Sequence, residues 1–383
     1  MRVLQLHTTY RQAGGEDEVV AAEAALLTDH GHEVVRHWRT NPEALGPTLK
    51  SLARAPYNRA AAAAVGRIVA AAQPDVAHVH NTWFAQSVSV IHALRRLRVP
   101  VVATVHNYRF ACIDGTFFRS GHPCFDCLGR ASAPGVLHRC YRESVPLSAL
   151  ASATVETGRR LGTWTRVVDR LVAPSETVRS ALLRAGADPG RVIVKPHFVD
   201  DPGPRAAPPS GSSEVLFIGR LAPGKGVEVL LEAWQRAGTR MRLLVFGDGP
   251  LRERLESCAP PGVTFLGHRP RAQARERMLS ARALAFPSVW PEPFGMVLIE
   301  AMAAGLPVVG ADAGSVRAIV DPQPPGLLVP PGDAAALAGV LTRVSTEDVV
   351  DAAGRAARER YADSFTPHAN LPQLLALYRA AIG

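Results

Sequence analysis

The chain has 383 residues, of which 47% are hydrophobic and 6% aromatic, and its formal net charge is +9. At roughly 100–200 residues per domain, this length favours two domains. No apolar run reaches the roughly 18 residues of a membrane-spanning helix, and no signal-peptide layout is present, so we expect a cytoplasmic protein. Its basic residues are dispersed, which disfavours nucleic acid as a partner and leaves anionic small molecules or an anionic membrane face.

The first half of the chain alternates short apolar runs with helix-like segments. This alternation predicts a parallel sheet with helices on both faces. The expected strands are 2–7, 33–38, 75–80, 99–106, 171–174 and 191–195, and the expected helices lie near 17–30, 58–72, 86–97, 147–160 and 176–185.

A segment rich in Pro, Gly and Ser, 199–213, interrupts the pattern and is interpreted as an interdomain linker. A second alternation follows, with strands at 214–219, 241–246, 263–266, 283–286 and 307–310, and helices near 226–237, 250–257, 270–281, 295–304 and 333–343. Two further helical stretches, 346–360 and 367–382, end the chain. We therefore expect an α/β protein of two doubly wound domains, 1–198 and 214–362, with a C-terminal helix, 363–383, that packs back on the first. Ligands of such sheets bind at the C-terminal ends of the strands, so we expect a cleft between those edges.

The first candidate site is the loop from Gly219 to Gly226, which follows an expected strand and opens a helix. A helix N-terminus offers unpaired N–H groups and partial positive charge, which suit phosphate. Arg220 adds a planar fork for oxyanions and Lys225 a point charge. The plainer alternative is a Gly/Pro-rich turn with two solvated cations.

The second candidate site is the string Pro-Glu-Pro-Phe-Gly-Met-Val-Leu-Ile-Glu at 291–300. Glu292 stands in a proline-bounded loop before a helix, and Glu300 lies within that helix. Backbone N–H groups near Gly295 begin the helix and suit an anion. Two carboxylates eight residues apart also arise by chance, so this pair alone indicates little.

Together the two strings resemble the signatures of family 4 retaining glycosyltransferases of the GT-B fold. These signatures are a Gly-Arg-x-x-x-x-Lys-Gly loop and a Glu-x7-Glu motif, and both are matched residue for residue. The similarity extends over nearly the whole chain, through the strings at 14–16, 104–107, 173–176 and 247–250. The resemblance implies two facing Rossmann-like domains, the first binding the acceptor and the second the nucleotide-sugar.

The resemblance also assigns catalytic roles. Arg220 and Lys225 bind the donor diphosphate and neutralise it as the glycosidic bond breaks. Glu292 contacts hydroxyls of the transferred sugar, and His106 reaches that sugar from the other domain. A hydrogen-bonded histidine at a strand end is the plainer interpretation of His106.

Further residues are implied as donor ligands. Glu300 accepts hydrogen bonds from the ribose, the backbone at 294–297 meets phosphate and sugar, and paired glycines let the backbone approach the donor. Asp248 and the loop containing His268 meet the base, although a turn role and a surface role are open for them, as is a helix N-terminal role for Glu16. The implied donor-binding set is Gly14, Gly15, Gly219, Asp248, Gly249, His268, Phe294, Gly295, Met296, Val297 and Glu300.

The implied reaction moves a sugar from a UDP- or GDP-sugar to a hydroxyl of a lipid-linked glycan, an oligosaccharide or a natural product. Retention is expected through front-side displacement. No Asp-x-Asp motif is present, so a donor-bound metal is not required and no cofactor is expected for catalysis. The positive charge favours peripheral contact with the inner membrane face. Two other classes stay open: a nucleotide-sugar epimerase-like enzyme of the same fold, and a nucleic-acid-binding protein.

Four of the five cysteines fall within a short, loop-rich stretch: Cys112, Cys124, Cys127 and Cys140. Four thiolates can wrap Zn²⁺ tetrahedrally, and a long loop without secondary structure needs a tether. The sequence therefore predicts a structural zinc site. The alternative is a set of small buried hydrophobic side chains.

Overall fold

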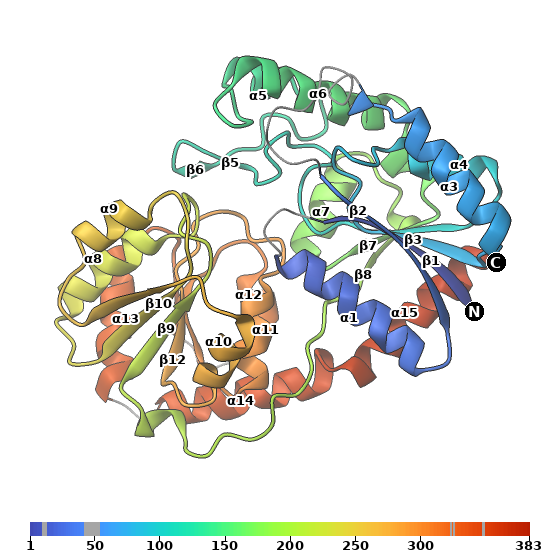
Figure 1. Cartoon of the computed structure of the whole chain (residues 1–383). Coiled ribbons are helices and arrows are strands. Elements are labelled where there is room, and N and C mark those ends of the chain that lie inside the picture. Colours follow the sequence, from blue (N-terminus) through green and yellow to red (C-terminus); the bar gives the residue numbers. More distant parts are fainter. Residues whose placement is uncertain (10–13, 42–53, 322–323, 325, 347–348) are drawn as a thin grey trace. The chain divides into compact units, whose positions relative to one another are not determined.

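The computed structural model describes residues 1–9, 14–41, 54–321, 324, 326–346 and 349–383. It divides into two compact units (Figure 1). The first comprises Met1–Phe117, Cys124–His197 and Asn370–Gly383, and the second Phe118–Pro123 and Phe198–Ala369. No helix in the described part of the chain is both long and apolar enough to cross a bilayer.

The first unit is built on a six-stranded parallel sheet of order β2-β1-β3-β4-β7-β8. The strand order reverses between β1 and β3, which makes the loops after these two strands the expected ligand position. The strands are β1 (Arg2–Thr9), β2 (Glu33–Thr40), β3 (Val76–Val79), β4 (Val101–Thr104), β7 (Arg170–Ala173) and β8 (Val192–Val194). Its helices are α1 (Gly15–Asp29), α3 (Arg59–Ala72), α4 (Ser89–Arg96), α5 (Ala133–Leu137), α6 (Val145–Arg160) and α7 (Glu176–Arg184), with a π-helix at Thr163–Val167 and a 3-10 turn at Pro189–Arg191.

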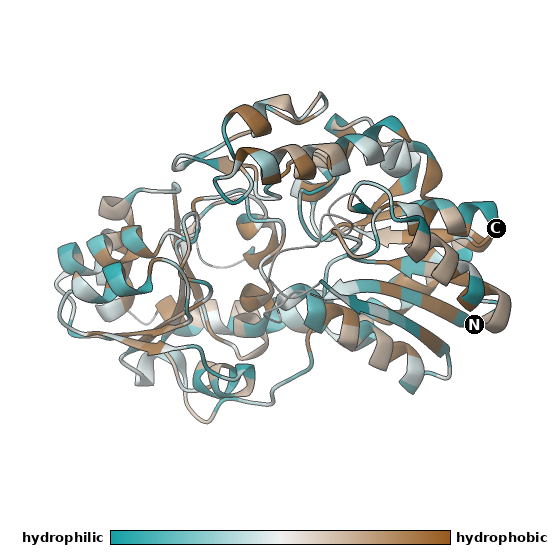
Figure 2. Ribbon diagram, turned by 45° about the horizontal axis from the view of Figure 1, so that its top comes forward, coloured by the Kyte–Doolittle hydropathy of each residue, from teal (hydrophilic) through white to brown (hydrophobic). Residues whose placement is uncertain are grey.

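Both faces of this sheet are apolar because helices cover both. Successive side chains of a strand point to opposite faces. Leu4 and Leu6 of β1 therefore join one core cluster, whereas Val3 joins another. In Figure 2 brown hydrophobic positions alternate with teal hydrophilic ones along the strands near the N-terminus.

Helix α15 (Pro367–Ile382) closes the second face of the first sheet with Leu374, Leu377 and Tyr378. Residues 370–383 thus belong to the first unit, whereas the start of the expected C-terminal segment, 363–369, belongs to the second.

The second unit carries a six-stranded parallel sheet of order β11-β10-β9-β12-β13-β14. The order reverses between β9 and β12, so the loops after these strands flank the switch point. The strands are β9 (Glu214–Ile218), β10 (Arg242–Phe246), β11 (Val263–Gly267), β12 (Ala283–Phe286), β13 (Val308–Ala311) and β14 (Leu328–Val329). The helices are α8 (Val227–Ala237), α9 (Arg252–Ser257), α10 (Arg271–Met278), α11 (Met296–Ala303), α12 (Val316–Val320), α13 (Ala334–Thr346) and α14 (Val349–Ser364).

The segment expected as a linker, 199–213, has contacts of its own within the second unit. It contains a 3-10 turn at Pro209–Gly211 that packs against α14. There the Ser210 hydroxyl donates to the Asp351 carboxylate over 2.6 Å. A two-stranded hairpin also branches from the first half of the chain, with β5 (Phe118–Arg119) antiparallel to β6 (His122–Pro123).

Candidate functional site

The loop after β9 lies against the loop after β12. Gly226, the N-cap of α8, has a φ of +71°. A Cβ at this position would lie 1.9 Å from the carbonyl oxygen of Pro287, which is shorter than any real contact. Glycine is therefore required here, and the tight approach places Lys225 beside the second candidate string.

Lys225 and Glu292 form an ion pair, with Nζ 2.9 Å from Oε2. Glu292 is 5% exposed, whereas 27% of the Lys225 side chain is exposed. The same Glu292 oxygen accepts from the Trp290 indole over 2.6 Å and from the Ser288 hydroxyl over 3.2 Å. The Lys225 ammonium also lies 4.6 Å from the centroid of the Trp290 ring. Among the described residues it is Lys225 that pairs with Glu292, while Arg220 is exposed at the end of β9.

One serine, Ser315, hydrogen-bonds to the backbone of the second string. The Ser315 hydroxyl donates to the carbonyl oxygens of Glu292 and Phe294, over 3.0 and 3.2 Å. Phe294 is buried in the core, and Gly295 caps α11 with a φ of +86°. The first N–H groups of α11, from Met296 onward, therefore begin directly beside this rigid loop. Met296 and Val297 are partly exposed in the first turn of that helix.

Glu300 is almost fully buried, at 4% exposure, in the middle of α11. Its Oε1 accepts hydrogen bonds from two arginines of α10, over 2.6 Å from Arg271 Nε and 2.8 Å from Arg275 Nη2. Two guanidinium groups thus orient this carboxylate.

The loops after β10 and β11 carry the remaining second-unit residues. Asp248 is exposed and accepts from the Gly249 N–H over 2.7 Å and from Arg252 over 3.1 Å. The Gly249 hydrogen bond, with further help from Arg252 and His268, lowers the pKa of Asp248. A Cβ on Gly247 would lie 1.9 Å from the carbonyl oxygen of Gly219, so the loops after β9 and β10 are in direct backbone contact. His268 is exposed after β11.

In the first unit, His106 follows β4 and lines a pocket that also includes Glu16, Asn107, Arg109 and Trp83. The Asn107 amide donates to Glu16 over 3.4 Å, which joins the strand-end segment to the first turn of α1. The guanidinium of Arg109 lies 4.6 Å from the Trp83 ring centroid. The pocket therefore combines an aromatic wall with polar groups of both signs.

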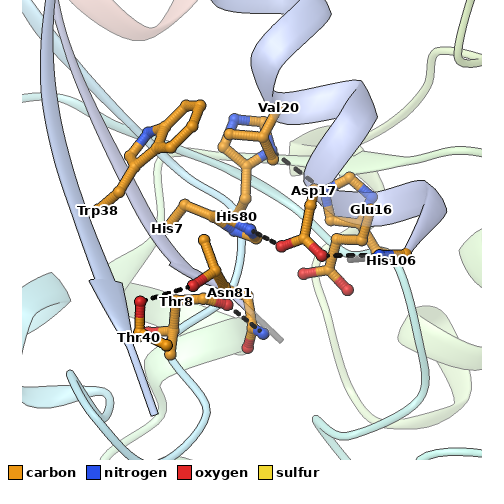
Figure 3. Close-up of polar contacts among 12 residues, drawn as sticks. His7, Thr8, Glu16, Asp17, Val20, Trp38, Thr40, His80, Asn81 and His106 are labelled. Atoms are coloured by element: carbon orange, nitrogen blue, oxygen red, sulfur yellow. Dashed lines mark hydrogen bonds and ion pairs between the residues drawn. The ribbon is translucent and has the colours of Figure 1, made fainter. Parts of the chain in front are cut away.

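His106 is hydrogen-bonded to a second histidine, His80, which follows β3 (Figure 3). The bond joins His106 Nε2 to His80 Nδ1 over 3.1 Å. Burial, with smaller contributions from neighbouring histidines, holds the pKa of both rings well below the ordinary value. Both imidazoles are therefore neutral at pH 7.

The paired glycines precede and open α1. Gly14 is its N-cap, and the Gly14 N–H donates to Asp17 over 2.9 Å. The Gly14 backbone is extended, at a φ of −121°, and a Cβ there would meet nothing within 4 Å. The fold itself does not require glycine at 14, so a requirement set by the donor stays a prediction for Gly14 and for Gly15.

The four clustered cysteines carry thiols, and all four are half-buried. Burial raises the pKa of Cys127 to about 11, against a hydrogen bond to the backbone of Gly135. The thiols of Cys112, Cys140 and Cys124 raise it further, so the four side chains are neighbours. In the structure described here, however, no three of their sulfurs lie within 4.8 Å of one another.

Several residues of the site were not predicted from the sequence. Trp290 and Ser288 share the Glu292 carboxylate with Lys225, and Arg271 and Arg275 hold Glu300. Trp290 stands two residues before Glu292, so an indole in a proline-bounded loop was an available signal. The arginines lie on another helix, and only the folded chain brings them to Glu300.

Two family models match the chain in succession. Residues 3–201 match "Glycosyltransferase Family 4", and residues 212–347 match "Glycosyl transferases group 1". The two models meet close to the expected linker. Together they cover the strings that carried the resemblance.

Relatives of the chain agree with these models. The chain is 31% identical to a phosphatidyl-myo-inositol mannosyltransferase of Mycobacterium leprae, over 94% of this chain and 84% of that protein. It is 32% identical to a 2-deoxystreptamine glucosyltransferase of Streptomyces kanamyceticus, over 76% of this chain and 73% of that protein.

Solved structures share the fold. A sucrose-phosphate synthase from Thermosynechococcus elongatus matches with a TM-score of 0.72 at 22% identity, covering 99% of this chain and 98% of that one. Anabaena HepE, solved in complex with UDP, matches with a TM-score of 0.68 at 20% identity, covering 99% of this chain and 100% of that one. The expected fold class, two Rossmann-like domains as in GT-B glycosyltransferases, is confirmed. The family models and the relatives identify the chain as an enzyme and a member of glycosyltransferase family 4.

Proposed function

We propose that the chain transfers a sugar from a nucleotide-diphosphate sugar to an acceptor hydroxyl with retention of configuration. The observation that carries this proposal is the position of Lys225. Its partly exposed ammonium stands beside the N-terminus of α8 and is held by Glu292 at the switch point of the second sheet. An anion placed there meets a cation and unpaired backbone N–H groups together.

The chemistry follows from charge. As the bond between the anomeric carbon and the diphosphate oxygen breaks, negative charge grows on the diphosphate. The proposed role of Lys225 and Arg220 is to stabilise that charge, and fixed cations do this without reorganisation during the reaction. The β-phosphate then takes the proton of the acceptor hydroxyl as that oxygen attacks the same face of the sugar. Such a step needs no protein nucleophile.

Metal independence and retention belong to the same proposal. Two cations supply the electrostatic stabilisation that a divalent ion provides in other transferases. Activity in an excess of EDTA, with an anomeric product of unchanged configuration by NMR, is the expected result. Loss of activity on chelation, restored by Mg²⁺ or Mn²⁺, would contradict the metal-independent mechanism.

The other donor ligands follow the same plan. Glu300 is proposed to accept the ribose hydroxyls, Glu292 to contact the sugar, and the first N–H groups of α11 to bind phosphate. HepE was solved with UDP and with UDP-glucose, and a relative is named for GDP-mannose, so UDP- and GDP-sugars are the proposed donors. The named acceptors of two relatives are phosphatidyl-myo-inositol and 2-deoxystreptamine. Both carry a hydroxylated six-membered carbocycle, and we propose an acceptor of that class, soluble or lipid-linked.

Nucleotide diphosphates are expected to stabilise the protein against heat. A ligand at 100 times its dissociation constant adds about 2.7 kcal/mol to the folded state. The measurement is a thermal-shift panel of UDP, GDP and their sugars, with UMP and GMP as controls that lack the β-phosphate. Equal shifts with mono- and diphosphates would contradict the diphosphate site. Products formed from donor alone would instead indicate an epimerase-like activity.

We also propose that the four clustered cysteines hold a structural zinc. The four thiols are neighbours, but no three of their sulfurs lie within 4.8 Å of one another in the described structure, so zinc binding requires small loop movements and loss of the thiol protons. The expected result is about one zinc per chain by metal analysis, lost in Cys127→Ser. Cys258→Ser, at an exposed cysteine in the second unit, is the matched control and should keep its zinc. A purified wild type without stoichiometric zinc would end the proposal.

The predicted cytoplasmic location and contact with an anionic membrane face stay predictions. Binding to vesicles of phosphatidylinositol, compared with neutral vesicles, tests the second. Steep weakening of that binding with salt is expected if charge drives it.

A further inference from the structure

A chain of polar groups runs through the first unit to His106. It begins at Lys195, directly after β8, and continues through Glu23 of α1 and His80, which follows β3. Lys195 is 2% exposed, Glu23 1% and His80 6%. Buried groups of this kind are costly unless paired, so their arrangement demands an explanation.

The carboxylate of Glu23 is ionised. Its Oε1 accepts from the Lys195 ammonium over 2.8 Å. Burial raises the pKa of Glu23, but Lys195 and neighbouring histidines outweigh it and leave the pKa below the ordinary value. An ionised carboxylate only accepts hydrogen bonds.

The second carboxylate oxygen of Glu23 determines which ring nitrogen of His80 carries the proton. Glu23 Oε2 lies 3.6 Å from His80 Nε2, and neither atom has a hydrogen-bond partner among the residues that the structure describes. A neutral imidazole carries one N–H, and a lone pair facing a carboxylate oxygen would be repelled. The proton of His80 therefore belongs on Nε2, and His80 Nδ1 is an acceptor.

The position of the proton on His106 follows from the position of the proton on His80. His80 Nδ1 lies 3.1 Å from His106 Nε2, so His106 Nε2 carries the hydrogen and donates. The remaining nitrogen of His106, Nδ1, then has a free lone pair. His106 is partly exposed and lines the pocket of the first unit.

We propose that Lys195, Glu23 and His80 are positioning residues that fix His106 as the Nε2–H tautomer, so that its Nδ1 accepts a hydrogen bond from a sugar hydroxyl. The accepting role rests on the proposed function, whereas the tautomer does not. Lys195, Glu23 and His80 are buried, and only His106, at the end of the series, is partly exposed. This series of contacts thereby fixes His106 Nε2 as the donor to His80 and leaves Nδ1 as the acceptor toward the ligand.

The neighbouring histidines have contacts of their own, and His78 Nδ1, which lies 3.7 Å from Glu23 Oε2, is already hydrogen-bonded to another residue. His7 Nε2 is bonded to Asp17 over 2.7 Å. His78 is bonded through Nδ1 to Tyr378 and through Nε2 to Thr104, each over 2.8 Å. His197 stacks on the His106 ring, with centroids 5.0 Å apart. None of these contacts changes which atom donates and which accepts in the hydrogen bond between His80 and His106.

A metal ion is the weaker explanation of the same cluster. Glu23, His78 and His80 have ligand atoms within 4.8 Å of one another. Both nitrogens of His78 are already hydrogen-bonded, however, and the Lys195 ammonium is bound to the same carboxylate. A divalent cation would lie beside a buried ammonium, and like charges at that distance repel strongly.

The tautomer is measurable without any substrate. Heteronuclear correlation NMR of the ¹⁵N-histidine-labelled full chain distinguishes Nε2–H from Nδ1–H rings, and His106→Gln assigns the signal. The expected result is a neutral Nε2–H ring for His106 and for His80 at pH 7. A Nδ1–H ring or a charged ring at His106 would overturn the proposal, as would zinc added alone shifting the His78 and His80 signals.

Kinetics then test the positioning role. In Glu23→Gln the amide oxygen still accepts from Lys195, whereas the NH₂ faces His80 Nε2 and favours the proton of His80 on Nδ1, which reverses the hydrogen bond between His80 and His106. The expected loss in kcat/KM is roughly 10–100-fold, the effect of leaving one polar group unmatched. Glu23→Asp keeps an acceptor and should retain most activity, and Glu232→Gln, at an exposed ion pair on α8, should retain all of it.

These outcomes separate the two proposals. If Glu23→Gln shows wild-type kinetics while His106 is Nε2–H, the positioning role is wrong. If it fails to fold, the wild-type NMR result and the Glu23→Asp kinetics decide. If no donor is turned over, the proposed function fails, and the tautomer assignment is still read directly.

Discussion

Lys225→Ala is expected to lower kcat by about 10²–10³-fold, because it removes a fixed cation from the place where the leaving diphosphate gains charge. The stability cost should be small. The Lys225 ammonium is partly exposed, and Glu292 keeps two other donors, Trp290 and Ser288. Steady-state kinetics with a UDP- or GDP-sugar, together with thermal unfolding of the same preparation, give both quantities.

Arg236→Ala provides the matched control for this prediction. Arg236 lies on α8, the helix that begins just after Lys225, and pairs with Glu232 at the exposed surface over 2.7 Å. Its removal takes one positive charge from the protein but none from the site, so kcat should stay at the wild-type value. If both variants lost activity equally, net charge and not position would explain the effect. A Lys225→Ala variant with normal kcat would refute the diphosphate role.

Much of the fold was predictable because the strands of parallel sheets are buried on both faces. Such strands appear as short continuous apolar runs, and those at 283–286 and 2–7 correspond closely to β12 and β1. Shorter elements were not predicted from the sequence. The strand β14, the hairpin β5–β6 and the one-turn helices α5 and α12 contain too few residues for a period to emerge. Their existence depends on tertiary contacts.

The candidate site was predictable where it depends on strings of adjacent residues. The loop at 219–226 and the string at 291–300 each combine glycines with charged residues in a fixed order. The contact between these two segments could not be predicted in the same way, because Lys225 and Glu292 are 67 positions apart and only the strand order places them together. Spacing likewise gave no reason to connect Glu300 with Arg271.

His106 illustrates the same limit. The sequence placed it at the end of an expected strand, 99–106, and in the structure it lies two residues after β4, which ends at Thr104. Its partner His80 also ends a strand, but adjacency of the two strands is a property of the sheet, in which β3 pairs with β4. Glu23 and Lys195 are 172 positions apart, and nothing local marks either as a partner of the other.

Glu292→Gln is expected to lower kcat by about 10²-fold while the protein stays folded. The amide keeps the shape of the side chain and still accepts from Trp290, but it no longer holds Lys225 by charge or offers an ionised acceptor to the sugar. Charged hydrogen bonds are worth more than neutral ones, by about 1.5–3 kcal/mol against about 1 kcal/mol. Initial-rate kinetics measure the change in kcat, and a thermal unfolding curve shows whether the variant stays folded.

A double-mutant cycle distinguishes the proposed unit from two independent contributions. If Lys225 and Glu292 act together on the same diphosphate and sugar, Lys225→Ala/Glu292→Gln should be about as slow as the slower single variant, because residues in contact are not additive. Glu300→Gln supplies the contrast, since its carboxylate is held by Arg271 and Arg275 and is proposed to contact the ribose. Its effect should combine additively with that of Lys225→Ala and fall mainly on the KM for donor. Full additivity between Lys225 and Glu292 would mean that the 2.9 Å ion pair has no part in the chemistry.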